Sequence, residues 1–96
     1  MGADSFQVRS SGETAQNAFQ NATADARHEY GHGGYTGSIA EKRSFRLLTV
    51  PEGKTIQQFA DEILWDDNHW ISEKSGPAGC IALGGGEYLF LGIARC

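Results

Sequence analysis

The sequence predicts an α+β fold: a mostly antiparallel sheet with two helices on one face, in the order β-α-β-α-β-β. Three observations support this prediction. Small apolar residues recur at helical spacing between residues 15 and 30, a second amphipathic helix follows residue 55, and an apolar pair of strands flanks Gly84-Gly85-Gly86. A chain of 96 residues can bury one modest core, so we expect a single domain spanning residues 1–96.

The first two elements are expected to be a strand and a helix. Residues 5–9 (SFQVR) alternate apolar and polar side chains, as a half-buried strand does. Ser10 and Glu13 have the spacing of a capping box, which predicts that a helix begins there. Its apolar face consists of Ala15, Ala18, Phe19, Ala22, Ala26 and Tyr30. The glycines from Gly31 onward end this helix.

The middle of the chain is expected to be extended and then helical. Residues 35–50 are predicted to form one long bent strand or two strands, and residues 44–50 (SFRLLTV) are the clearer part. Residues 51–54 form a turn. Thr55, with Gln58 three residues later, caps the second helix. The apolar stripe of that helix is Ile56, Phe59, Ala60, Ile63, Leu64 and Trp70.

Residues 80–95 (CIALGGGEYLFLGIAR) predict a β-hairpin around the three glycines. Residues 88–94 of this hairpin are almost entirely apolar. Two short helices on one face would leave the other face of the sheet uncovered. We therefore expect a homo-oligomer that uses the apolar hairpin as an assembly edge.

Composition narrows the classes of function. The chain is 40% hydrophobic and 21% charged, as globular proteins are, and its net charge of −4 argues against general nucleic-acid binding. Residues 1–50 carry five basic and five acidic side chains, whereas residues 51–96 carry three basic and seven acidic ones. No apolar run approaches the length of a membrane span, and the N-terminus lacks a signal pattern. We predict a cytoplasmic protein whose two cysteines are free thiols.

Residues 28–32 (HEYGH) match the H-E-x-x-H pattern of zinc peptidases. On a helix, His28 and His32 would share one face, and Glu29 would activate a zinc-bound water. A third ligand would have to come from Glu62, Asp66 or His69. Because His32 lies between two glycines, where helical geometry fails, we favour a solvated helix end and expect no metal or other cofactor. The zinc peptidase remains an alternative.

The glycine-rich loop that follows suggests a binding site for a small anion. Successive glycines allow backbone N–H groups to point toward one anion, arginines grip phosphate, and tyrosines stack on a base. An ordinary helix-to-strand connection with solvated charges is the competing interpretation. The candidate ligand-binding residues are Arg27, His28, Tyr30, His32, Gly33, Gly34, Tyr35, Thr36, Lys42, Arg43, Arg46 and Trp70.

The stretch from Glu29 to Lys42 (EYGHGGYTGSIAEK) resembles a segment of small bacteriophage proteins. Compact acidic phage proteins of this size often act as antagonists of host defence. Some sequester cyclic nucleotide signals as oligomeric sponges, and others block a host nuclease by imitating the charge of DNA. The resemblance implies a class of role only and assigns no function to individual residues.

These observations together predict a non-enzymatic, phage-type anti-defence protein that binds and sequesters a small anionic ligand of the cyclic nucleotide kind. Two alternatives remain open at this point. One is the zinc peptidase on His28, Glu29 and His32, and the other is an acidic inhibitor that binds a host nuclease through the second half of the chain.

Overall fold

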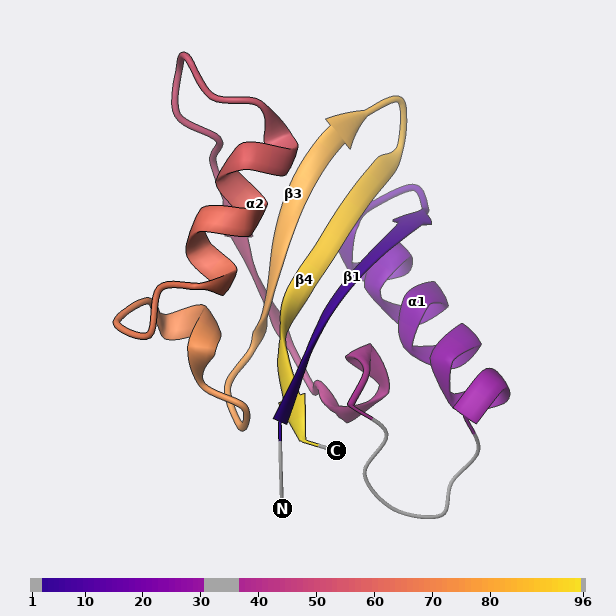
Figure 1. The fold of residues 1–96 in the computed structure, drawn as a ribbon. Coiled ribbons are helices and arrows are strands. Elements are labelled where there is room, and N and C mark those ends of the chain that lie inside the picture. Colours follow the sequence, from indigo (N-terminus) through magenta and orange to yellow (C-terminus); the bar gives the residue numbers. More distant parts are fainter. Residues whose placement is uncertain (1–2, 31–36, 96) are drawn as a thin grey trace.

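The computed structural model describes residues 3–30 and 37–95, which form a four-stranded sheet with a helix against each face (Figure 1). The elements follow the predicted order. They are β1 (Ala3–Ser11), α1 (Ala15–Tyr30), the 3-10 helix η1 (Ile39–Glu41), β2 (Phe45–Leu48), α2 (Ile56–Leu64), the 3-10 helix η2 (Trp70–Ser72), β3 (Ala78–Gly84) and β4 (Glu87–Arg95). The predicted α+β class and a mostly antiparallel sheet are confirmed.

The strands lie in the order β1-β4-β3-β2, so the C-terminal hairpin occupies the middle of the sheet. β4 pairs antiparallel with both β1 and β3, and β2 pairs parallel with β3 from Phe45 opposite Ala78 to Leu48 opposite Ile81. β1 and β2 are the two edges. The three strands β1, β2 and β3 therefore run in the same direction, and only β4 runs against them.

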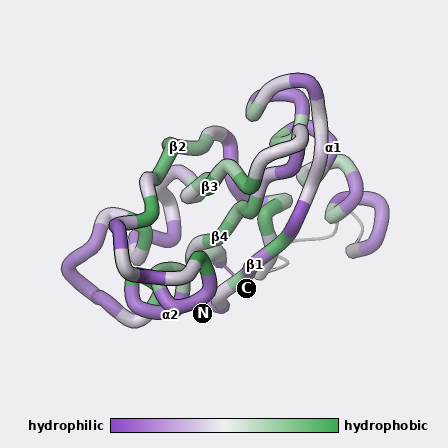
Figure 2. The backbone as a smooth tube through the Cα atoms, turned by 90° about the horizontal axis from the view of Figure 1, so that it is seen from above, coloured by the Kyte–Doolittle hydropathy of each residue, from purple (hydrophilic) through white to green (hydrophobic). Residues whose placement is uncertain are grey.

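The two helices cover opposite faces of the sheet, and the prediction that they share one face is wrong. Successive side chains of a strand point to opposite faces. In β4, Phe90 belongs to the cluster under α1, whereas its neighbours Leu89 and Leu91 belong to the cluster under α2. Viewed from above, α1 and α2 lie on either side of the row of strands (Figure 2).

The direction of the two crossovers explains this arrangement. The connection through α1 runs from β1 at one edge to β2 at the other, and the connection through α2 runs back from β2 to β3. Both connections join parallel strands, and such crossovers are right-handed in about 98% of proteins. Two right-handed crossovers that travel in opposite directions across a sheet must pass on opposite faces.

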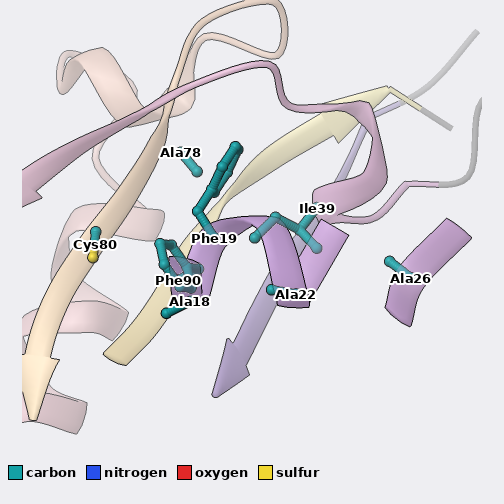
Figure 3. Packing of buried hydrophobic residues seen from close by; sticks show 8 residues of the cluster. All are labelled: Ala18, Phe19, Ala22, Ala26, Ile39, Ala78, Cys80 and Phe90. Carbon is teal, nitrogen blue, oxygen red and sulfur yellow. The ribbon is translucent and has the colours of Figure 1, made fainter. Parts of the chain in front are cut away.

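The alanine face of α1 packs on the sheet as the sequence predicts. Ala18, Ala22 and Ala26 are buried because a small side chain lets the helix approach the strands closely (Figure 3). Phe19 is the large side chain of this helix face and packs against two strands. Its ring centroid lies 5.1 Å from that of Phe45 in β2 and 5.6 Å from that of Phe90 in β4, within the range of favourable aromatic pairs.

The amphipathic helix α2 begins at the predicted capping box. The Thr55 hydroxyl accepts a hydrogen bond from the Gln58 N–H (3.1 Å), and the Gln58 side chain accepts one from the Thr55 N–H (3.0 Å). Its buried residues, Ala60 and Ile63, pack on Ile81, Leu89 and Leu91 of the sheet and on Ile71 of η2.

Three predicted boundaries differ from the structure. Ser10 lies in β1 rather than at a helix start, and Thr14 caps α1 instead, because its hydroxyl accepts from the Asn17 N–H (3.1 Å). The expected long strand over residues 35–50 is reduced to β2, because Ser38 caps the 3-10 helix η1. α2 ends at Leu64, so Trp70 belongs to η2.

The predicted hairpin is confirmed, but it is not an assembly edge. Gly85 and Gly86 have φ of 62° and 82°, and a two-residue loop of the type I′ kind requires positive φ at both of its central residues. Gly84 (φ 92°) is the last residue of β3 and lies at a register shift of the ladder. β4 lies between β1 and β3, and its apolar residues face α1 on one side and α2 on the other. The core accounts for the apolar run, so homo-oligomer formation stays a prediction without this support.

Candidate functional site

Several segments distant in sequence meet at one end of the sheet. Because β2 and β3 are parallel and begin in register, the residues that precede them lie side by side, and the Ala78 N–H donates to the Ser44 carbonyl (3.0 Å). β4 runs the other way, so its last residue, Arg95, reaches the same end. The C-terminal part of α1 adds Arg27. In Figure 1 this is the end where η1 and the last residues of β4 lie.

A cleft of about 710 Å³ opens where these segments meet. It lies between residues 40–44 on one wall and residues 74–77 on the other. Among the described residues, five basic side chains and one acidic side chain line it. The lining residues are Arg27, Ala40, Glu41, Lys42, Arg43, Ser44, Lys74, Ser75, Gly76, Pro77 and Arg95. We call this the basic cleft.

Lys42 joins the two walls of the basic cleft. The residue is only 2% exposed, and its Nζ donates to the backbone carbonyls of Glu73 (3.3 Å), Lys74 (3.3 Å) and Gly76 (3.0 Å). An ammonium has three N–H donors, so these carbonyls occupy all of them. Burial lowers the pKa of Lys42 below its usual 10.5, and the Glu73 carboxylate opposes this shift. Lys42 therefore shapes the cleft rather than offering a free donor to a ligand.

Gly92 of β4 lies beside both the Phe6 ring and the stem of Lys42. A Cβ at this position would lie 3.2 Å from the Phe6 ring, which is tighter than most side-chain contacts, and 3.7 Å from Cε of Lys42, which is ordinary contact. The glycine therefore makes room for the Phe6 ring next to the lysine stem.

Arg27, Arg43 and Lys74 are the cations of the cleft that remain available to a ligand. All three residues are exposed, and none forms an ion pair with another described residue. Arg95 is held differently, since its Nη2 donates to the Ser75 hydroxyl (2.7 Å). A guanidinium held in this way is well suited to a bidentate contact with phosphate or carboxylate.

Of the predicted ligand residues, the structure brings Arg27, Lys42 and Arg43 together and places two others elsewhere. Arg46 lies on β2, with its Cζ 4.9 Å from the centre of the Trp70 ring. Trp70 also contacts the His69 ring and packs against the cluster under α2. Neither Arg46 nor Trp70 lines the basic cleft.

The remaining candidates fall on or beside the connection between α1 and η1. His28 is exposed on α1, and Tyr30 is the last residue of that helix. Among the predicted ligand residues, His32, Gly33, Gly34, Tyr35 and Thr36 lie outside the described residues. The chain re-enters the described part at Gly37, whose N–H donates to the Arg95 carbonyl at the edge of the cleft (2.6 Å).

The zinc alternative loses its proposed third ligand. His28 and Glu29 lie on α1, whereas Glu62 lies on α2 across the sheet. Asp66 follows α2, and His69 caps η2, both on that same far side. His69 also uses Nδ1 to accept the Ile71 N–H (3.1 Å). Within residues 3–30 and 37–95, no group of three histidine, cysteine or acidic side chains lies close enough to hold a metal ion.

Sequence reasoning missed Lys74, Ser75 and Arg95. The second half of the chain is acidic overall, and these residues look like isolated charges in it. Only the parallel pairing of β2 with β3 would have revealed them, because it places residues 74–77 beside residues 41–44. The acidic half therefore divides. Four of its seven carboxylates, Asp61, Glu62, Asp66 and Asp67, lie on or just after α2, while two of its three cations line the basic cleft.

Comparison of the chain with protein-family models, curated proteins and solved structures gives no match. The phage resemblance of residues 29–42 thus remains a hypothesis about class. In the described part of the chain, no helix combines the length and the apolar character needed to span a bilayer.

Proposed function

We propose that this protein binds a small anionic ligand in the basic cleft without transforming it. The observation that carries the proposal is the concentration of five cationic side chains around one concavity of a chain with a net charge of −4. Such a concentration of like charge is unfavourable in the empty protein and is relieved by a bound anion. The volume of about 710 Å³ falls within the range of small-molecule sites.

A nucleotide is the ligand class that we propose. Arg27 and Arg43 are exposed guanidinium groups that can each contact a phosphate through two N–H donors. Their neighbourhood in sequence contains Tyr30 and Tyr35, and aromatic rings stack on nucleobases. A role as a cytoplasmic, oligomeric sponge for a cyclic nucleotide signal of host defence follows from the phage resemblance and completes the proposal.

Calorimetric titration with a panel of anions tests this function. The panel contains linear and cyclic mono- and dinucleotides, with inorganic phosphate and acetate as simple anions. We expect at least one nucleotide to bind, and Arg43→Ala and Arg27→Ala each to weaken that binding by about tenfold, which corresponds to roughly 1.4 kcal/mol.

Arg46→Ala is the matched control, because it removes the same charge from a position on the Trp70 ring outside the cleft. Binding of phosphate alone would limit the proposal to a simple anion site. If no anion of the panel binds, or if Arg46→Ala weakens binding as much as Arg43→Ala, the proposal is wrong.

A further inference from the structure

β1 is a long edge strand whose outer side is open at its centre. Toward its two ends, the outward Ser5 N–H donates to the Asp4 carboxylate and the outward Ser11 carbonyl accepts from the Asn21 amide. β1 pairs with β4 along all nine of its residues, Ala3–Ser11, and no strand among the described residues pairs with its other side. Open edges present unpaired backbone donors and acceptors, which other chains can recognise by adding a strand. Figure 1 shows β1 at the margin of the sheet, with α1 behind it.

The ladder register shows which backbone groups face outward. The Gly12 N–H donates to the Gly86 carbonyl (3.0 Å), so these two residues form a hydrogen-bonded pair. In an antiparallel ladder every second pair of opposite residues is hydrogen-bonded, and the pairs between them are not. Even-numbered residues of β1 therefore bond to β4. The N–H and C=O groups of Gln7 and Arg9 point away from the sheet, and no described residue hydrogen-bonds to them.

A groove of about 160 Å³ runs beside this edge, between β1 and α1. It is lined by four consecutive residues of β1, Phe6 to Arg9, and by one stripe of α1, together with Ser38 and Ile39 of the η1 region. Phe6, Val8, Ala22, Ala26 and Ile39 give it an apolar lining. Phe6 and Val8 are only half-buried, so the apolar surface is accessible from the open edge.

Two carboxylates border the groove. Asp25 and Glu29 lie one helical turn apart on α1, and both are exposed. Neither forms an ion pair with another described residue. A strand added to β1 would point every second side chain toward α1. An apolar side chain of the added strand would then contact Phe6 and Val8, and a basic one would lie near the two carboxylates.

We propose that the open edge of β1 accepts an extended, basic–apolar segment of a partner protein as an additional strand. The backbone N–H and C=O groups of Gln7 and Arg9 form the hydrogen bonds to the added strand, and the apolar lining of the groove contacts its apolar side chains. The carboxylates of Asp25 and Glu29 favour a basic side chain in the partner. This surface shares no lining residue with the basic cleft, so the two proposals stand or fall separately.

Charge favours a foreign partner over a second copy of this chain. Two copies paired antiparallel through β1 would be related by a two-fold axis perpendicular to the sheet, so both α1 helices would lie on the same face. The carboxylates of Asp25 and Glu29 would then meet their own copies across the interface. Like charges so placed are unfavourable, whereas a lysine or arginine of another protein is complementary.

Fluorescence anisotropy with labelled peptides of nine residues, the length of β1, tests the inference. The panel carries threonine at alternate positions and valine, leucine or lysine at the others. We expect peptides with both valine and lysine to bind. N-methylation of the peptide amides that face β1 should abolish binding, because these amides donate to the backbone of Gln7 and Arg9. N-methylation of the amides that point away from β1 should leave binding unchanged.

The variant Asp25→Asn/Glu29→Gln should weaken binding of these peptides by about fivefold, the size expected for exposed ion pairs. Glu62→Gln/Asp67→Asn, on the far side of the sheet, is the charge-matched control. The inference is overturned if no peptide of the panel binds, if both N-methylated sets bind equally, or if sedimentation shows that β1 recruits a second copy of this chain instead.

Discussion

The ammonium of Lys42 lies 3.0 Å from the carbonyl oxygen of Gly76, and the same group also reaches the carbonyls of Glu73 and Lys74. This contact joins the segment before β2 to the segment before β3. Within the same segment, the Ser75 hydroxyl accepts a hydrogen bond from Arg95, and the Gly76 N–H donates to the Glu73 carbonyl. Lys42 therefore supplies three of the contacts that position Lys74 and Ser75 in the basic cleft.

We predict that Lys42→Met destabilises the fold by about 2 kcal/mol, since methionine keeps the apolar stem but leaves three carbonyls without their charged donor. Urea denaturation measures this loss. Lys54→Met is the control, because Lys54 is partly exposed and its surface ion pair with Glu62 contributes about 0–1 kcal/mol. Equal effects of the two variants would show that the Lys42 contacts are unimportant.

The lowered pKa of Lys42 predicts a specific pH dependence. Because burial holds the folded-state pKa below 10.5, the unfolded chain binds more protons between the two pKa values. The part of the stability that depends on this pKa difference is therefore complete above 10.5 and is lost as pH falls through the folded pKa.

Unfolding of the wild type and of Lys42→Met from about pH 8 to 10.5 isolates this contribution, since other titrating groups are common to both proteins. The stability of the wild type relative to the variant should rise with pH. A relative stability that falls with pH would mean that the three carbonyls raise the pKa instead.

Cys80 is predicted to be unreactive in the folded protein. It is a free, fully buried thiol of β3, and burial raises its pKa from 9.0 to about 11. The thiolate is the reactive form, so iodoacetamide at pH 8 should leave Cys80 unmodified without denaturant and alkylate it in urea. Peptide mass spectrometry locates the modification. Alkylation of native Cys80 at the rate seen in urea would contradict its burial.

Gly79 is predicted to be required for packing under α2. A Cβ there would lie 2.7 Å from Cδ1 of both Ile71 and Leu48. Gly79→Ala should therefore cost about 1–3 kcal/mol through overpacking, measured by thermal or urea unfolding.

Ile71→Val removes one of the two methyl groups that the new Cβ of Gly79→Ala would contact. The double variant Gly79→Ala/Ile71→Val should therefore lose less stability than the sum of the losses of the two single variants. Simple additivity would indicate that the alanine is accommodated elsewhere.

Features that depend on neighbours in sequence were predictable. The Thr55–Gln58 capping box, the glycine turn before β4 and the alanine face of α1 each need only residues within a few positions, and all three are found in the structure. Some predicted boundaries of helices and strands were wrong by a few residues. The cap of α1, for example, is Thr14 and not Ser10.

Features that depend on strand order were not predictable. The side of the sheet on which α2 lies follows from the return of the chain from β2 to β3, which no local pattern reveals. Lysine is almost never fully buried, and Lys42 is buried because its partners come from carbonyls 31 to 34 residues away. The sequence grouped Arg27, Lys42 and Arg43, which the structure places around one cleft, but it did not group Lys74 and Arg95 with them, because these two reach the cleft through strand pairing.

An NMR titration of ¹⁵N-labelled protein with the tightest-binding nucleotide tests the central claim most directly, because it shows where the ligand lies. We predict saturable shifts of the backbone amides of Arg43, Ser44, Ser75 and Gly76, which line the basic cleft, and no shifts of Gln58 and Ile63 on α2. Shifts confined to α2 or to the edge of β1, or no saturable shift at any residue, would contradict the account.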